Sequence, residues 1–133
     1  MPVADRFPAP TPVRLAPTAG GGAVTLSVHE AGRGPAIVFC HGFPDLAYSW
    51  RHQVPALAAA GYRAIAPDQR GYGASDRPDA VEAYGLTELT GDMVALLDTL
   101  DVERAGHWVQ QEYPDAVTAR ILAWLPRAFA VRR

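Results

Sequence analysis

The chain has 133 residues, of which 49% are hydrophobic and 20% are charged, and its formal net charge is −2. This length and composition fit one globular domain with a modest core, and they argue against two full domains or wholesale disorder. The small net charge gives no reason to expect nucleic acid or an anionic membrane as a partner, and no stretch approaches the ~18 apolar residues of a membrane span.

The first segment, residues 1–19, is rich in proline, and we expect it to form an extended arm. It has neither the apolar core of a signal peptide nor an arginine-rich amphipathic face. Cys40 is the single cysteine of the chain, so an internal disulfide is excluded. These features together predict a cytoplasmic protein.

Predicted strands and helices follow one another over residues 20–105. Residues 23–29 alternate apolar and polar side chains, which indicates a half-buried strand. Residues 36–40 are continuously apolar, which is typical of a strand buried on both faces of a parallel sheet. Residues 48–60 are predicted to be helical, with a join near Pro55, and residues 62–66 form the next predicted strand.

A glycine-rich loop is expected next, over residues 67–78. The following helix ends at Leu100, and we expect the side chain of Thr87 to cap its start. A last helix begins at Pro114 and is followed by a basic tail, residues 128–133. The order strand, helix, strand, helix predicts an α/β fold with a mostly parallel sheet and flanking helices.

Three motifs resemble those of soluble epoxide hydrolases of the α/β-hydrolase fold. They are His-Gly-Phe-Pro-Asp-Leu-Ala-Tyr-Ser-Trp at 41–50, Pro-Asp-Gln-Arg-Gly-Tyr-Gly-Ala-Ser-Asp at 67–76 and Gly-His-Trp-Val-Gln-Gln-Glu-Tyr-Pro at 106–114. The first is shared with many α/β-hydrolases, and the third is more specific. By this resemblance residues 20–105 are the N-terminal half of the hydrolase domain, and residues 106–127 are its C-terminal histidine motif and helix.

The resemblance also implies a reaction and a set of residues. In this family an aspartate attacks a small-molecule epoxide, two tyrosines of a cap domain polarise the ring oxygen, and a histidine activates the water that hydrolyses the resulting ester. His107 matches that histidine. The backbone amide of Phe43 matches an oxyanion-hole donor, with Gly42 and Pro44 shaping the turn. The loop at residues 68–75 matches a structural turn, and no cofactor is implied.

Much of the family's pattern is missing from this chain. Residues 101–105 are not followed by a Gly-His-Asp-Trp-Gly or Gly-x-Ser-x-Gly elbow, so no residue matches the nucleophile. The cap, its tyrosines and the segment that carries the acid partner of the histidine are also missing. We therefore expect a partial hydrolase fold, joined across a deletion near Ala105, in which the strand ending at Cys40 becomes an edge of the sheet. Such an edge predicts marginal stability, a homo-oligomer or a partner chain that covers it.

Other roles for the polar residues have weaker support. His41 could bind a metal with His52, His107 or Asp68, but no pair has a recognised ligand spacing, and a hydrogen-bonded histidine beside the turn is the simpler interpretation. Asp45 is expected to be a solvated loop residue and Cys40 a small buried hydrophobe.

The interpretation of the whole chain stays open between alternatives. The first is an enzyme that works only when a second polypeptide supplies nucleophile, acid and cap. The second is a non-catalytic remnant that binds a partner strand at its sheet edge. The third is a misjoined version of a longer hydrolase sequence.

Overall fold

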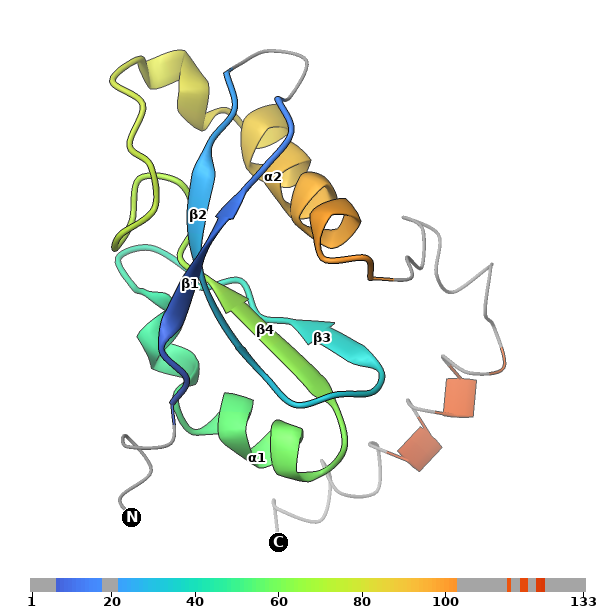
Figure 1. The fold of residues 1–133 in the computed structure, drawn as a ribbon. Coiled ribbons are helices and arrows are strands. Elements are labelled where there is room, and N and C mark those ends of the chain that lie inside the picture. Colours follow the sequence, from blue (N-terminus) through green and yellow to red (C-terminus); the bar gives the residue numbers. More distant parts are fainter. Residues whose placement is uncertain (1–6, 18–21, 103–114, 116–117, 120–121, 124–133) are drawn as a thin grey trace, which may run out of the picture. The chain divides into compact units, whose positions relative to one another are not determined.

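The computed structural model describes residues 7–17, 22–102, 115, 118, 119, 122 and 123. A four-stranded sheet forms the centre of the first part, and helices pack on both of its faces (Figure 1). The strands are β1 (Pro10–Arg14), β2 (Thr25–Ala31), β3 (Ala36–Val38) and β4 (Arg63–Pro67). The helices are the 3-10 helix η2 (Ala47–Trp50), α1 (Gln53–Ala59), the 3-10 helix η3 (Val81–Tyr84) and α2 (Leu86–Thr99).

The sheet is mixed, with the strand order β1-β2-β4-β3. β1 is antiparallel to β2, β2 is antiparallel to β4, and β3 is parallel to β4. The parallel pair is joined by a crossover through α1, which is the kind of connection that parallel strands require. The α/β fold with flanking helices is thus confirmed, while the first two strands give the sheet more antiparallel pairing than the sequence predicted.

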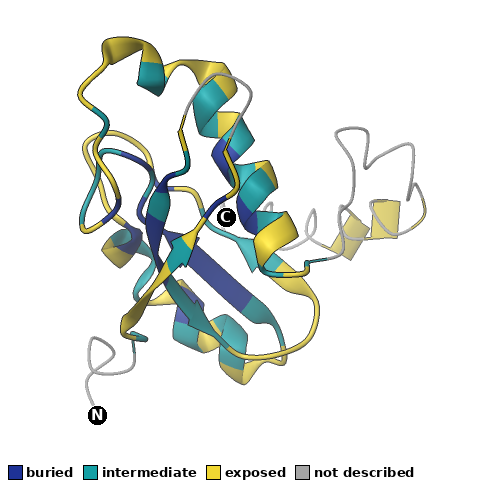
Figure 2. Ribbon diagram, turned by 45° about the horizontal axis from the view of Figure 1, so that its top comes forward, coloured by how far each residue is buried: buried dark blue, intermediate teal, exposed yellow. Residues whose placement is uncertain are grey.

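Side chains of β4 alternate between two apolar cores, one on each face of the sheet. Ile65 packs in the first core with Leu96 of α2, whereas Ala64 and Ala66 pack in the second with Val54 of α1. Figure 2 shows β4 as the most continuously buried strand. The two helices therefore cover opposite faces and enclose β4 between them.

Strand β1 lies in the segment that we expected to be an extended proline-rich arm. Just beyond the strand, Leu15 donates its N–H to the carbonyl of Val24 over 2.8 Å. In this antiparallel register, the backbone nitrogens of positions 10 and 12 face away from β2, toward the open side of the sheet. Pro10 and Pro12, which have no N–H, therefore lose no hydrogen bond there. Alternating prolines are thus compatible with an edge strand, and the pairing with β2 corrects the prediction of an arm.

Truncating Leu15 tests whether this strand contributes to stability. Leu15 is only 1% exposed, so Leu15→Ala is expected to lower the free energy of unfolding by about 2–4 kcal/mol. Pro12→Ala, at an exposed position of the same strand, is expected to change it by less than about 1 kcal/mol. Urea unfolding followed by circular dichroism measures both values, and equal losses would contradict the described packing of β1.

Strand β3 is shorter and less buried than the sequence predicted. It ends at Val38, Ile37 and Val38 are half-buried, and Ala36 is exposed. Among the described residues β3 is the last strand on its side of the sheet, so no neighbouring strand covers its outer edge. Within the described part of the chain, this agrees with the expected edge position. The interpretation of Cys40 as a buried hydrophobe is wrong, because its side chain is exposed and its sulfur lies 3.4 Å from that of Met93.

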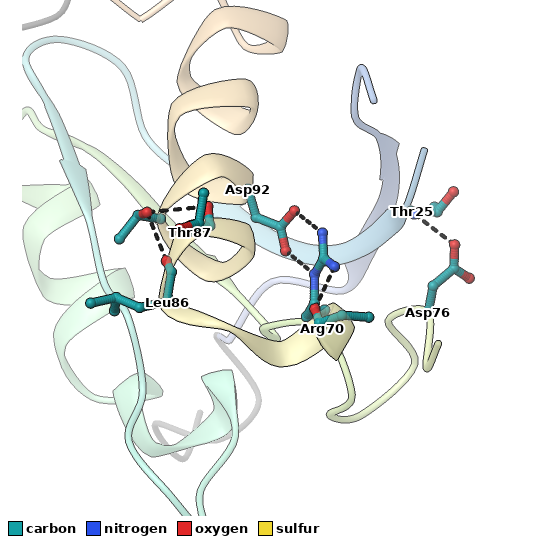
Figure 3. Close-up of polar contacts among 8 residues, drawn as sticks. Thr25, Arg70, Asp76, Leu86, Thr87 and Asp92 are labelled. Carbon is teal, nitrogen blue, oxygen red and sulfur yellow. Dashed lines mark hydrogen bonds and ion pairs between the residues drawn. The ribbon is translucent and has the colours of Figure 1, made fainter. Parts of the chain in front are cut away.

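Helix α2 begins one residue before the predicted cap. The N-cap residue is Gly85, which has no side chain to cap the helix, so the capping role predicted for Thr87 is wrong. Thr87 lies in the first turn, where the hydroxyl of Thr90 is shared between the carbonyls of Leu86 (2.8 Å) and Thr87 (3.3 Å) (Figure 3). The 3-10 helix η3 ends at Tyr84, so Gly85 alone separates it from α2.

The C-terminal segment is described at five positions. All of them have helical backbone, as predicted for this segment: Asp115, Thr118, Ala119, Leu122 and Ala123. His107 lies outside the described residues. In the part of the chain that the structure describes, no helix combines the length and the hydrophobicity of a membrane span.

Candidate active-site turn

The sequence His-Gly-Phe-Pro, residues 41–44, follows β3 and is called here the β3 turn. It leaves the carboxyl end of a parallel strand, the end at which α/β sheets bind ligands. The N–H of Asp45 donates to the carbonyl of Gly42 over 2.9 Å and closes the turn, and the peptide bond between Phe43 and Pro44 is cis. The chain reverses there and enters η2.

The backbone amide of Phe43 is available to a ligand. In the described part of the chain its N–H donates to no acceptor, and its side chain is 87% exposed. A Cβ atom added to Gly42 would meet no atom within 4 Å, so the space beside the amide is open. An unpaired N–H next to open space is the kind of donor that stabilises an oxyanion. This geometry is compatible with the predicted oxyanion role, which stays a prediction.

His41 is buried and uses both of its ring nitrogens. Nε2 accepts the backbone N–H of Gln69 over 3.0 Å, and Nδ1 lies 3.1 Å from the carbonyl of Gly42. Because Nε2 accepts, the ring proton belongs on Nδ1, which donates to Gly42. The Gln69 side-chain amide donates to the His41 carbonyl. The His41 imidazole and the Tyr72 ring meet edge to face, with 4.8 Å between their ring centroids. The hydrogen-bonded histidine beside the turn is confirmed, and its Nε2 lone pair is not free for a metal.

Residues 68–76, the support loop, hold the start of η2, shortly after the β3 turn. The side chain of Asp68, 6% exposed, accepts the N–H of Ala47 over 2.8 Å. The carbonyl of Asp68 accepts the hydroxyl of Ser75 (2.6 Å), and Ser75 Oγ accepts the N–H of Ser27 in β2 (2.8 Å). These bonds link β2, the support loop and the start of η2, so the structural role that the resemblance gave to this loop agrees with its contacts.

Two further contacts anchor the support loop (Figure 3). Arg70 donates through Nε (2.7 Å) and Nη2 (2.6 Å) to the two carboxylate oxygens of Asp92, and through Nη1 to the carbonyl of Ala83. Arg70 is 2% exposed and Asp92 1%. The hydrogen bond to Asp92 raises the pKa of Arg70, against the opposing effect of burial. At the end of the loop, the Asp76 side chain accepts the N–H of Thr25 over 2.7 Å, and the N–H of Asp76 donates to the carbonyl of Thr25 over 2.9 Å.

Sequence reasoning missed the Arg70–Asp92 pair, although a signal for it was present. Asp92 falls on the same face of α2 as the buried Leu96 and the half-buried Leu89 and Met93. A carboxylate on an apolar helix face needs a buried cation or several hydrogen bonds. The residue that supplies them is 22 positions away, in a loop.

Two nucleophilic candidates lie close to the β3 turn in sequence. Asp45 is exposed and accepts the N–H of Leu46 over 2.8 Å, which agrees with the expected loop residue. Although Cys40 as a residue is exposed, its sulfur lies against Met93, and this partial desolvation raises the pKa of the thiol, so the thiolate is disfavoured at neutral pH. Neither residue therefore replaces the aspartate nucleophile that the sequence lacks.

Comparison with known proteins finds α/β-hydrolases, among them several epoxide hydrolases. A family model described as alpha/beta hydrolase fold matches residues 35–128. Epoxide hydrolase A of Mycobacterium tuberculosis is 56% identical over 102 residues, which are 75% of this chain and 30% of the relative. An epoxide hydrolase of Caballeronia sordidicola is 54% identical over 82 residues, which are 62% of this chain and 25% of the relative.

Solved structures show the same likeness. The crystal structure of an epoxide hydrolase from Vigna radiata matches with a TM-score of 0.67 and 42% identity, over 77% of this chain and 31% of that one. Epoxide Hydrolase A from Mycobacterium thermoresistibile matches with a TM-score of 0.62 and 52% identity, over 72% of this chain and 30% of that one. The chain thus spans less than a third of the length of these relatives.

Proposed function

Since this chain belongs to the α/β-hydrolase fold family, we propose that it supplies the oxyanion-binding turn of an epoxide hydrolase. The reaction would open a small-molecule epoxide to a diol through an ester on an aspartate. The observation that carries the proposal is the N–H of Phe43, which has no acceptor among the described residues. It lies in a turn that the support loop holds at His41 and, shortly after the turn, at Ala47. The similarity to several epoxide hydrolases supports an epoxide as the substrate class.

In the proposed reaction the turn acts during hydrolysis of the ester. Water attacks the ester carbonyl, its proton passes to a base, and the carbonyl oxygen becomes negative. The N–H of Phe43 would donate to that oxygen as the charge develops. His107 would be the base, an assignment that rests on the resemblance of residues 106–114 alone. We propose a cytoplasmic location for the chain as well.

The isolated chain is proposed to be inactive, because it contains no match to the nucleophile. A second polypeptide would then have to supply the nucleophile, the acid and the cap. The edge of β3, which none of the described strands covers, favours a second candidate function, in which the chain is non-catalytic and binds a partner strand or a second copy there. Activity that depends on an added chain would separate these two functions.

Epoxide hydrolysis by the purified 133-residue chain is the direct test. We expect no diol formation above the buffer rate with an aryl epoxide, and no change in His107→Ala. Turnover that disappears in His107→Ala would mean that the chain holds a complete site, contrary to the proposal.

Transplanting the segment tests the turn itself. We call the graft a protein in which residues 35–102 replace the corresponding segment of the Mycobacterium tuberculosis relative, and we expect it to hydrolyse epoxides. In the graft, Phe43→Pro removes the N–H and should lower kcat about 10²–10³-fold, while Phe43→Ala keeps the N–H and should have a much smaller effect. Equal kcat values for the two variants would exclude the amide as an oxyanion donor.

A further inference from the structure

We propose that His41 and Gln69 form a positioning pair that aims the N–H of Phe43 at the reacting oxygen. This inference rests on the proposed function of the β3 turn. Neither side chain needs to touch the substrate. Their role would be to fix one peptide plane, the one that joins Gly42 to Phe43.

The hydrogen bonds of Gly42 carry the first step. Its carbonyl and the N–H of Phe43 belong to the same planar peptide group and point in opposite directions. That carbonyl accepts both Nδ1–H of His41, over 3.1 Å, and the N–H of Asp45, over 2.9 Å. With its carbonyl held by two donors, the peptide cannot rotate freely, so the direction of the Phe43 N–H is set from the other side of the plane. Donors on the carbonyl also polarise the peptide and strengthen its N–H as a donor.

Gln69 decides which nitrogen of His41 carries the proton. Its backbone N–H donates to Nε2 over 3.0 Å, and its side-chain amide holds the carbonyl of the same histidine. An imidazole whose Nε2 accepts a hydrogen bond must keep its proton on Nδ1 to donate to Gly42. His41 is 4% exposed, so water has little access to replace either bond.

The position of Gln69 is itself fixed by its neighbours in the support loop. Asp68 is bonded to Ala47, and Arg70 is bonded to Asp92 of α2. The buried ion pair thus anchors Arg70, the backbone neighbour of Gln69, and Gln69 in turn is hydrogen-bonded to His41 beside the β3 turn. In this arrangement His41 is a neutral donor and not a general base, because its Nε2 lone pair is already used.

The protonation pattern can be measured on the full 133-residue chain. Nitrogen-15 spectra of the His41 ring are expected to show a proton-bearing Nδ1 and a bare Nε2 at neutral pH. Gln53→Ala, at an exposed glutamine of α1, should leave this pattern unchanged. A proton on Nε2 in the unmodified chain would overturn the positioning role.

Two substitutions of His41 in the graft separate positioning from packing. The side-chain amide of asparagine can occupy the place of Nδ1 and donate to Gly42, whereas that of glutamine reaches the place of Nε2 and cannot. We expect His41→Gln to lower kcat about 10- to 100-fold without raising KM, and His41→Asn to recover most of that loss. An inactive unmodified graft would overturn the proposed function and with it the positioning role. An active graft in which His41→Gln keeps full kcat would overturn the positioning role alone.

Discussion

Arg70→Met is expected to lower the free energy of unfolding by about 3–5 kcal/mol, because it leaves the carboxylate of Asp92 buried without its partner. Both side chains are about 1% exposed, so water cannot take the place of the guanidinium. The carbonyl of Ala83 loses a donor as well. Because a small domain has only about 5–15 kcal/mol of net stability, the loss should be visible as a large fall in the urea midpoint. Because the pKa of Arg70 is raised, the guanidinium keeps its charge at neutral pH, and its part of this contribution would be lost only in strong alkali.

The same substitution at Arg63 is a matched control. Arg63 pairs with Glu30 over 2.5 Å, but the two side chains are 25% and 33% exposed. Arg63→Met should therefore cost no more than about 1 kcal/mol. The double variant Arg70→Met with Asp92→Leu should recover most of the loss, because it removes both buried charges. Equal costs at positions 70 and 63 would show that the Arg70 pair is not buried as described.

Local periodicity predicted the elements whose burial depends on their own sequence. The apolar faces of α1 and α2 and the strands β2 and β4 lie close to their predicted ranges. The partial exposure of β3 was not predictable in this way, since a short apolar run has no period that distinguishes one buried face from two. Its edge position was expected from the missing nucleophile strand and not from periodicity. β1 was missed because prolines disfavour a central strand, and only the register on β2 shows that Pro10 and Pro12 face the open side.

Some features of the candidate site were likewise predictable from the sequence and others were not. The sequence predicted the β3 turn, a hydrogen-bonded His41 and the support loop, because each is a contiguous motif. It could not predict the proton position on His41, which depends on Gln69, 28 residues away. Ion pairs such as Arg70–Asp92 escape motif reasoning for the same reason, because their partners meet only in the folded chain.

Gly32→Ala is expected to destabilise the chain more than Gly61→Ala or Gly22→Ala. Gly32 lies between β2 and β3 with φ of +83°, and an added Cβ would lie 2.1 Å from the carbonyl oxygen of Tyr62 and 2.8 Å from Cα of Ala58. Both are backbone atoms, so no side-chain rotation relieves the overlap. Relief would require α1 and the start of β4 to move away from the turn, which would open the core around Val54.

At Gly32 the cost of backbone strain adds to the cost of steric overlap, and two other glycines separate these two costs. Gly61 has φ of +89° but open space where its Cβ would be, so Gly61→Ala should cost about 1–2 kcal/mol from backbone strain alone. Gly22 has open space and no positive φ, so Gly22→Ala should be neutral or stabilise by up to about 1 kcal/mol. Thermal unfolding of the three variants should therefore rank them in the order 22, 61, 32. A Gly32→Ala chain as stable as Gly61→Ala would mean that α1 yields easily, and the second core would then be too loosely packed to hold the start of the β3 turn in place.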